Sequence, residues 1–331
     1  MDVFEHLLRA LPPRATVPSL DVWLERLTQC PFEEPIDRAL WSGFEADRLG
    51  YAFVGGYRAA LSRLFMRQSR SLATTVERRY EWPSREECLS LAATEAGGGH
   101  PRAIQTVLVE ERGALVVRGE KTFATLASAA DELLVVASRG LDTDGKNRLA
   151  LVRVRKDAPG VTVEDRPPTP FAPEIPHARV TLADVAVSSE DVLPGDGYTA
   201  YLKPFRTIED TYVLASTLAH VIGTARAHGF APAVTESAIG LAITLHTLTA
   251  RQPEDPVWHV ALAGVFEATH RLIDAHADEW SKAPAPVRER WLRDQPLLLV
   301  ASQVRQQRTA AAWRDLASSA APATPSDPEP G

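Results

Sequence analysis

The middle of the chain is a series of short apolar runs with no helix-length pattern between them. Turn sequences separate these runs, among them Arg112-Gly113, Thr143-Asp144-Gly145 and Ala158-Pro159-Gly160. Successive parallel strands need a long crossover, usually a helix, so this pattern excludes a βαβ sheet. We expect an antiparallel β-sandwich or barrel with strands at Cys88–Ala93, Gln105–Glu110, Ala114–Arg118, Glu132–Ser138, Leu149–Arg155, Val161–Asp165 and Ala178–Leu182.

Helical periodicity precedes this β region. Ser19 is a candidate N-cap for the apolar residues that follow it with helical spacing, and Tyr51–Met66 carries one apolar stripe. The pair Gly55-Gly56 lies within that stripe. It marks either close packing against another helix or the start of a helix.

Helical periodicity returns after the β region, in segments Ile208–Ala227, Leu241–Leu248, Val257–Trp280 and Pro296–Leu316. The first of these is expected to be buried on most sides. The predicted fold class is therefore α+β, with an N-terminal helical domain at 1–88, a central antiparallel β domain at 89–202 and a C-terminal four-helix bundle at 203–317. The tail at 318–331 is rich in Pro and Ala and is predicted to be disordered.

Charge and cysteine content limit the classes of function. The 331 residues have a formal net charge of -7, which argues against binding to nucleic acid. Cys30 and Cys88 are the only cysteines, which indicates a reducing, cytoplasmic compartment. No apolar run is long enough for a membrane span. The sequence also lacks metal-ligand histidine spacing, a P-loop and a dinucleotide-binding glycine pattern, so we expect no metal site.

Two stretches with strand-like sequence between them are the candidate ligand site. Thr94-Glu95 stands just before Gly97-Gly98-Gly99, and Phe123-Ala124-Thr125 follows about 30 residues later. A glycine triplet alone is more often a mobile turn, and a Phe or Thr beside a strand usually only packs. Their order favours a loop that lets a flat ligand approach backbone amides.

These stretches resemble the acyl-CoA dehydrogenase family, whose members have the same three-part plan. Leu91-Ala92-Ala93-Thr94-Glu95-Ala96-Gly97-Gly98-Gly99 resembles the family's Leu-Ala-Met-Thr-Glu-Pro-Gly-Ala-Gly element. Gly119-Glu120-Lys121-Thr122-Phe123-Ala124-Thr125 resembles its Gly-x-Lys-x-Trp-Ile-Thr element, and the spacing also fits. The resemblance implies an FAD-dependent oxidoreductase that introduces an α,β double bond into acyl-CoA or another acyl thioester, as in fatty acid metabolism.

The resemblance also implies roles for the motif residues. Thr94 and the amides of Gly97, Gly98 and Gly99 would hydrogen-bond the pyrimidine edge of the flavin. Phe123 would replace the tryptophan that packs beside the ring, and Thr125 would lie near flavin N5. The family usually continues with Ser-Asp after the glycines, whereas this chain has His100-Pro101. His100 is a candidate to replace the lost phosphate contact.

The catalytic base and the phosphate ligands are less well defined by the resemblance. Asp210 aligns near the glutamate slot of some members, and Glu209 stands beside it. A first-turn acid that the helix dipole favours is the alternative interpretation of Asp210. Arg206 is a candidate phosphate ligand, with an ion pair as the alternative. The late Tyr-Glu-Gly-type element that holds the base in other members is missing. So is the Gln-x-x-Gly-Gly-x-Gly element that holds the dinucleotide end of a neighbour's FAD.

Three interpretations of the function stay open. The first is a dehydrogenase that forms a homodimer or tetramer. The second is a catalytically deficient partner subunit in a hetero-oligomer with a full-length homologue. Flavin-dependent oxygen chemistry on the same scaffold is a third interpretation, because it needs no catalytic glutamate.

Overall fold

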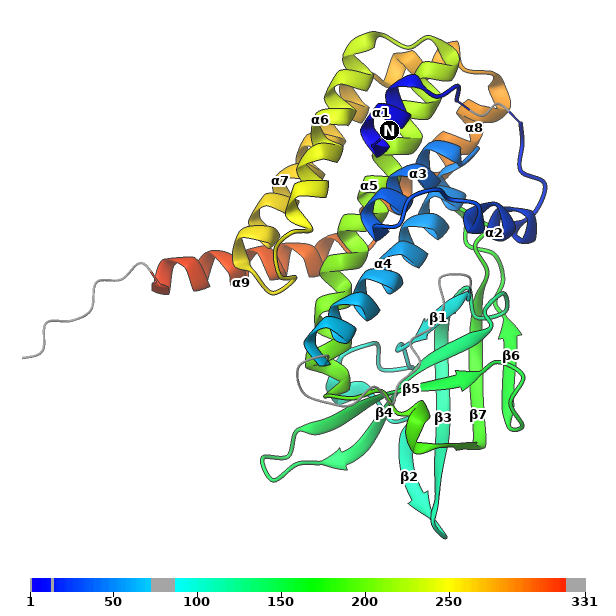
Figure 1. Cartoon of the computed structure of the whole chain (residues 1–331), viewed down its shortest axis with the longest axis vertical. Coiled ribbons are helices and arrows are strands. Elements are labelled where there is room, and N and C mark those ends of the chain that lie inside the picture. The colour runs from blue at the N-terminus through cyan, green and yellow to red at the C-terminus, as the bar shows by residue number, and fades with distance from the viewer. Residues whose placement is uncertain (1, 13–14, 73–86, 320–331) are drawn as a thin grey trace, which may run out of the picture.

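A computed structural model describes residues 2–12, 15–72 and 87–319, and it places helices from both ends of the chain above one curled sheet (Figure 1). The helices are α1 (Val3–Arg9), α2 (Leu20–Thr28), α3 (Pro35–Glu45), α4 (Leu49–Leu72), α5 (Lys203–His228), α6 (Pro232–Leu248), α7 (Pro256–Ala275), α8 (Ala285–Asp294) and α9 (Ser302–Ser319). The strands are β1 (Leu89–Ala92), β2 (Val107–Glu111), β3 (Ala114–Thr125), β4 (Glu132–Leu141), β5 (Asn147–Arg155), β6 (Val161–Asp165) and β7 (His177–Val187). The α+β fold class is confirmed. Most of the tail predicted to be disordered lies outside the described residues.

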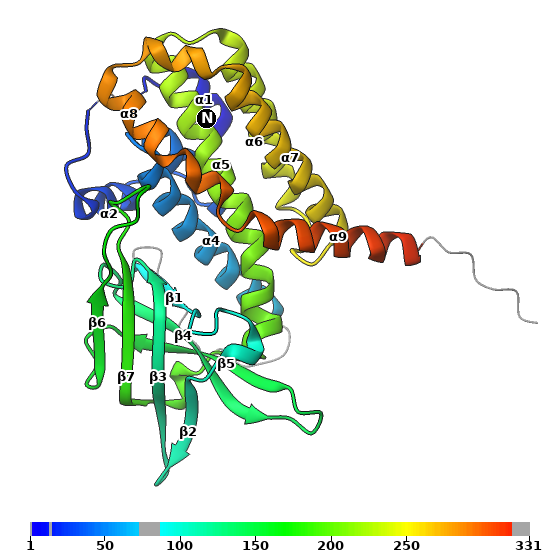
Figure 2. The ribbon, with the colours of Figure 1, turned by 180° about the vertical axis from the view of Figure 1, so that it is seen from behind.

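Helix α5 is the centre of the helical part and packs against α3, α4 and α6 (Figures 1 and 2). Every residue from Leu214 to Ala225 is buried, as the apolar sequence predicts. Glycines allow this close packing, since a Cβ at Gly56 would lie 2.8 Å from the carbonyl oxygen of Tyr212. The pair Gly55-Gly56 lies inside α4, so close packing and not a helix start explains it.

The C-terminal helices differ from the sequence prediction at their ends. Helix α6 begins at Pro232, with proline in its first turn, and α7 ends at Ala275 because His276 leaves the helical conformation. Helix α9 begins only at Ser302, after Ala301 with a φ of 60°. The described residues also contain α8, a short helix between prolines that the sequence analysis did not predict.

The sheet has the strand order β1-β4-β2-β3-β7-β6, with β5 paired to β4. Most pairs are antiparallel, but β1 and β2 each pair with β4 in parallel, with Leu89 opposite Glu132 and Val107 opposite Ser138. The sheet is therefore mixed, which the predicted antiparallel arrangement did not include. The β2–β3 hairpin lies between β1 and β4 in the sequence and provides the crossover that a parallel pair needs without a helix.

Two apolar cores meet at this sheet. Leu134 and Val136 of β4 face the core shared with the helices, while Leu133, Val135 and Ala137 face the core inside the curled sheet. The alternation follows from the two-residue period of a strand. The same parity places Ala124 and Ala178 inside the β core, so their neighbours Thr125 and His177 point to the other face.

Candidate functional site

Four side chains at the ends of neighbouring strands form an aromatic surface, defined here as Thr94, Phe123, Thr125 and His177. Thr94 pairs with Phe123 in an isolated bridge, and the Thr94 carbonyl accepts a 2.8 Å hydrogen bond from the amide of Thr122. Thr125, the last residue of β3, lies opposite His177, the first residue of β7. The strand register therefore brings together three of the residues that the sequence analysis selected. Phe123 is 38% exposed, so part of this aromatic residue is accessible to a ligand.

His177 makes two contacts within this surface. Its ring stacks on Phe123 with a centroid separation of 4.3 Å and an interplanar angle of 24°. Its Nδ1 atom lies 3.2 Å from the hydroxyl oxygen of Thr125. Burial and the nearby Arg166 guanidinium lower the pKa of His177 to about 4, so the ring is neutral at pH 7. Arg166 also lies 5.8 Å from the centre of the Phe123 ring.

The glycine loop beside this surface closes on itself. The Glu95 and Gly98 main chains exchange hydrogen bonds of 3.2 and 2.8 Å. Gly98 has a φ of 95°, a conformation that favours glycine, and a Cβ built there meets nothing within 4 Å. The loop is therefore a tight turn whose outer side is open, as the flat-ligand hypothesis requires.

A buried ion pair anchors the glycine loop to the sheet. The Lys121 ammonium group lies 2.6 Å from Glu95 Oε1, and Lys121 is 0% exposed. Glu95 also accepts hydrogen bonds from the amides of Gln105 and Thr106, at 2.7 and 3.1 Å. Burial lowers the pKa of Lys121 to about 8. For Glu95, burial opposes ionisation, but the hydrogen bond and charge of Lys121 hold its pKa below the usual range.

Arg206 joins the glycine loop to a cavity at the start of α5. Its Nη2 atom donates to the Gly99 carbonyl at 3.3 Å, and a Cβ at Gly99 would lie 3.7 Å from Thr94 Oγ1. The cavity has a volume of about 670 Å³ and lies between the glycine loop, α5, the α6–α7 connection and α9. Its polar lining includes His100, Lys203, Arg206, His259 and Arg308, and its apolar lining includes Tyr198, Pro256 and Ala312.

The two candidate bases lie in different environments. Asp210 is paired with Arg305 Nη1 at 3.3 Å and with Arg308, both from α9. Glu209 is half-buried and has no ion-pair partner among the described residues. Burial, reinforced by the charge of Asp210, raises the pKa of Glu209 to about 7. The structure thus separates adjacent acids into one that is ion-paired and one whose pKa is near neutrality.

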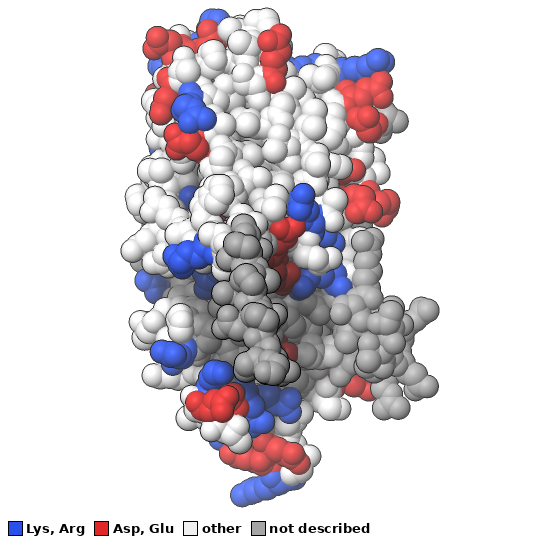
Figure 3. Space-filling view, turned by 90° about the vertical axis from the view of Figure 1, so that its left-hand side faces the viewer, with Lys and Arg blue, Asp and Glu red and all other residues white. Residues whose placement is uncertain are grey.

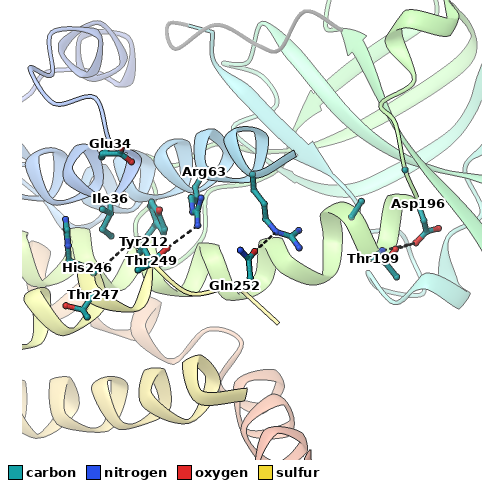
Figure 4. A pocket seen from close by; sticks show the side chains of 14 residues that line it. Glu34, Ile36, Arg63, Asp196, Thr199, Tyr212, His246, Thr247, Thr249 and Gln252 are labelled. Carbon is teal, nitrogen blue, oxygen red and sulfur yellow. Dashed lines mark hydrogen bonds between the residues drawn. The ribbon is translucent and has the colours of Figure 1, made fainter. Parts of the chain in front are cut away.

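A second cavity, with a volume of about 990 Å³, lies along α4, α5 and the end of α6 (Figure 4). Arg63, Tyr212, His246 and Gln252 are among its lining residues. None of the predicted site residues lines it. The glycine loop and the aromatic surface therefore remain the candidate site.

Comparison with known proteins finds a match in the part of the chain that contains the candidate site. A family model for the acyl-CoA dehydrogenase middle domain matches residues 90–185, which contain both motif stretches. The β region therefore resembles the middle domain of acyl-CoA dehydrogenases.

Among curated proteins, the chain is similar to "Probable acyl-CoA dehydrogenase YngJ" of Bacillus subtilis (strain 168), with 31% identity over 113 residues. The alignment covers 34% of this chain and spans only 28% of the YngJ protein.

Solved structures resemble the chain over most of its length. Butyryl-CoA dehydrogenase from Megasphaera elsdenii has a TM-score of 0.65 and 15% identity, over 94% of this chain and 96% of that chain. PigA with FAD and proline has a TM-score of 0.63 and 13% identity, over 96% and 93% respectively. At these identities the likeness shows the fold of the acyl-CoA dehydrogenase family.

Several contacts of the site were not anticipated from the sequence. His177 and Arg166 carry no motif, and only the pairing of β3 with β7 brings His177 to Thr125. Glu95 and Lys121 do lie inside the two motif stretches, so the presence of an acid and a base there was an available signal.

Among the described residues, no helix is both long and apolar enough to cross a membrane.

Proposed function

We propose that the chain is an acyl-CoA dehydrogenase family member that binds FAD on the aromatic surface and oxidises the α,β bond of an acyl thioester. The observation that carries the proposal is the partly exposed Phe123 near the hydroxyl-bearing residues Thr94 and Thr125, beside a glycine loop with an unobstructed outer side at Gly98. A flavin needs an apolar face and a few polar groups at its edge. The described residues supply both.

The donor groups suit an isoalloxazine ring. Gly98 lets a planar group approach the main chain, because no side chain blocks it. Thr94 and Thr125 can each donate or accept one hydrogen bond at the ring edge. When bound, FAD would supply a two-electron acceptor for the reaction. The PigA structure named above holds FAD and proline, which supports this cofactor for the fold.

We propose Glu209 as the base that removes the α-proton of the thioester. Its pKa of about 7 makes the carboxylate available near neutral pH and basic enough to accept a proton. Asp210 is less suited, because Arg305 and Arg308 already bind its carboxylate. We therefore assign Asp210 to holding α9 against α5.

We propose that the cavity at the start of α5 takes the phosphate-bearing end of the ligand. Arg206 and Lys203 line it, and guanidinium and ammonium groups are the usual phosphate ligands in proteins. His100 lines the same cavity, which is where a replacement for the family's serine would be needed.

Partner-subunit function is the second candidate. Helices α6 and α7 present a side with few charged residues (Figure 3). Within these helices Ile243 is 46% exposed and Val257 39% exposed. In α6 the only Asp, Glu, Lys or Arg is Glu236. A charge-poor helical face of this kind suits contact with another subunit, so we propose an oligomer formed through α6 and α7.

The visible spectrum of the purified full chain, supplemented with FAD, tests the proposal. Bound flavin that is bleached anaerobically by an acyl-CoA would support dehydrogenase function. Glu209→Gln should abolish bleaching without loss of FAD, whereas Asp210→Asn should still be bleached. Protein that binds no FAD alone but does so with a longer homologue would support the partner-subunit function instead. Equal bleaching by both variants would contradict the role of Glu209.

A further inference from the structure

The Thr125 hydroxyl and the His177 ring form one hydrogen bond, in which either residue can be the donor. The two residues face each other at the ends of β3 and β7, with 3.2 Å between Oγ1 and Nδ1. A hydroxyl carries one proton and accepts through its lone pairs. Whichever residue donates in this contact therefore decides what the hydroxyl can offer to a third group.

The neutral ring of His177 can take either role. Its pKa of about 4, lowered by burial and by Arg166, leaves one protonated and one unprotonated nitrogen at pH 7. With the proton on Nδ1, His177 donates to Thr125, and the hydroxyl proton is available to a ligand. With the proton on Nε2, Thr125 donates to His177, and the hydroxyl oxygen accepts from a ligand.

Stacking and a hydrogen bond hold the His177 ring in place while its proton changes position. His177 stacks on Phe123 at 4.3 Å. Arg166 donates a 2.9 Å hydrogen bond to the Thr122 carbonyl, next to Phe123 in β3. The exchange therefore needs no movement of the ring, only loss of a proton from one nitrogen and gain of a proton from solvent at the other. The proton count of the pair does not change.

We propose that His177 is a positioning residue whose tautomer makes Thr125 a donor toward the oxidised flavin ring and an acceptor toward the reduced ring. This inference rests on the proposed function, which places the flavin on the aromatic surface. Flavin N5 has a lone pair when oxidised and a hydrogen when reduced, so a group with one fixed role would match only one form. The Thr125–His177 pair matches both.

Nitrogen-15 NMR of the FAD-loaded full chain, labelled at histidine, tests the proposal directly. We expect the proton of His177 on Nδ1 in the oxidised protein and on Nε2 after anaerobic photoreduction. His220 is an internal reference, because its Nδ1 lies 3.0 Å from the Ala46 carbonyl and must donate in both states. The same His177 tautomer in both redox states would overturn the inference.

The affinity of the protein for each flavin form is a second, independent readout. His177→Phe keeps a ring against Phe123 but removes the nitrogen, and Thr125→Val removes the hydroxyl. Because the pair matches both flavin forms, we expect each change to weaken the binding of oxidised and of reduced flavin by a similar factor, about tenfold, and to leave the reduction potential nearly unchanged. His276→Gln, at the end of α7, should leave both affinities unchanged. A loss of affinity for one flavin form only, measured as a potential shift of about 30 mV or more for a two-electron couple, would overturn the inference.

Failure of the inference and failure of the proposed function are distinguishable. Protein that binds no FAD, alone or with a longer homologue, overturns both. Bound FAD with one fixed tautomer of His177 overturns only the inference about His177.

Discussion

The ammonium group of Lys121 lies 2.6 Å from the carboxylate of Glu95, and both side chains are buried between the sheet and the glycine loop. The Lys121 ammonium also donates to the Val136 carbonyl at 2.5 Å. Glu95 in turn holds the amides of Gln105 and Thr106. One ion pair thus connects both motif stretches with the centre of the sheet.

Removal of one partner of this pair is expected to be costly. Lys121→Met leaves a buried carboxylate without its counter-charge, and we expect a loss of about 3–5 kcal/mol in the free energy of unfolding. Denaturant unfolding measures it. Lys146→Met is the matched control, because its pair with Asp144 is exposed and spans 3.6 Å, and we expect a change within about 0.5 kcal/mol. Equal effects of the two changes would contradict the role of Glu95 and Lys121.

Helix packing predicts opposite outcomes for two glycines. A Cβ at Gly43 in α3 would overlap the Ser216 carbonyl of α5, so Gly43→Ala should destabilise the protein by about 1–3 kcal/mol or more. At Gly264 in α7 a Cβ meets nothing within 4 Å. Gly264→Ala should therefore stabilise by about 0.5–1 kcal/mol through helix propensity. Thermal unfolding compares the two, and similar melting temperatures would contradict the close approach of α3 and α5.

The ion pairs of Asp210 are expected to hold α9 against α5. Asp210→Asn removes the charge that pairs with Arg305 and Arg308, and we expect a loss of about 1.5–3 kcal/mol, since hydrogen bonds to charged groups have this magnitude. Hydrogen exchange should accelerate in α9 more than in α6. Arg314→Gln, exposed on α9, is the control and should leave exchange unchanged. Unaltered exchange in α9 after Asp210→Asn would show that other contacts hold the helix.

The raised pKa of Glu209 makes the stability of the folded protein depend on pH. Its pKa is raised from 4.5 to about 7 by burial, so the folded state holds its proton where the unfolded state has released it. The carboxylate therefore destabilises the fold increasingly between those two values. Glu209→Gln should be nearly neutral at about pH 4 and should raise the melting temperature at about pH 8.

Glu267→Gln, on the exposed side of α7, is the matched control for Glu209 and should show the same small effect at both pH values. If Glu209→Gln lowered the melting temperature at high pH, the carboxylate would instead be stabilised by a partner. That result would also weaken the case for Glu209 as a base.

Local signals in the sequence predicted much of the fold. Ser19 caps α2 by accepting from the amide of Val22 at 3.3 Å, as an N-cap serine should. Strand β6 occupies Val161–Asp165, the predicted range. These features depend on residues close in the chain, so period and turn chemistry suffice to find them. The parallel pairing of β1 with β4 and the short helix α8 depend on packing and were not predictable in this way.

The sequence by itself determined the order of helical and β regions, the two motif stretches and the resemblance to a flavin-binding family, because each is encoded in a continuous run of residues. Only the tertiary structure decided that Thr125 contacts His177, 52 residues away, and that Arg308 of α9 forms an ion pair with Asp210, 98 residues away. Strand register and helix packing set such contacts, and both arise from the burial of whole elements against one another. For that reason adjacent acids in the sequence, Glu209 and Asp210, have different environments in the fold.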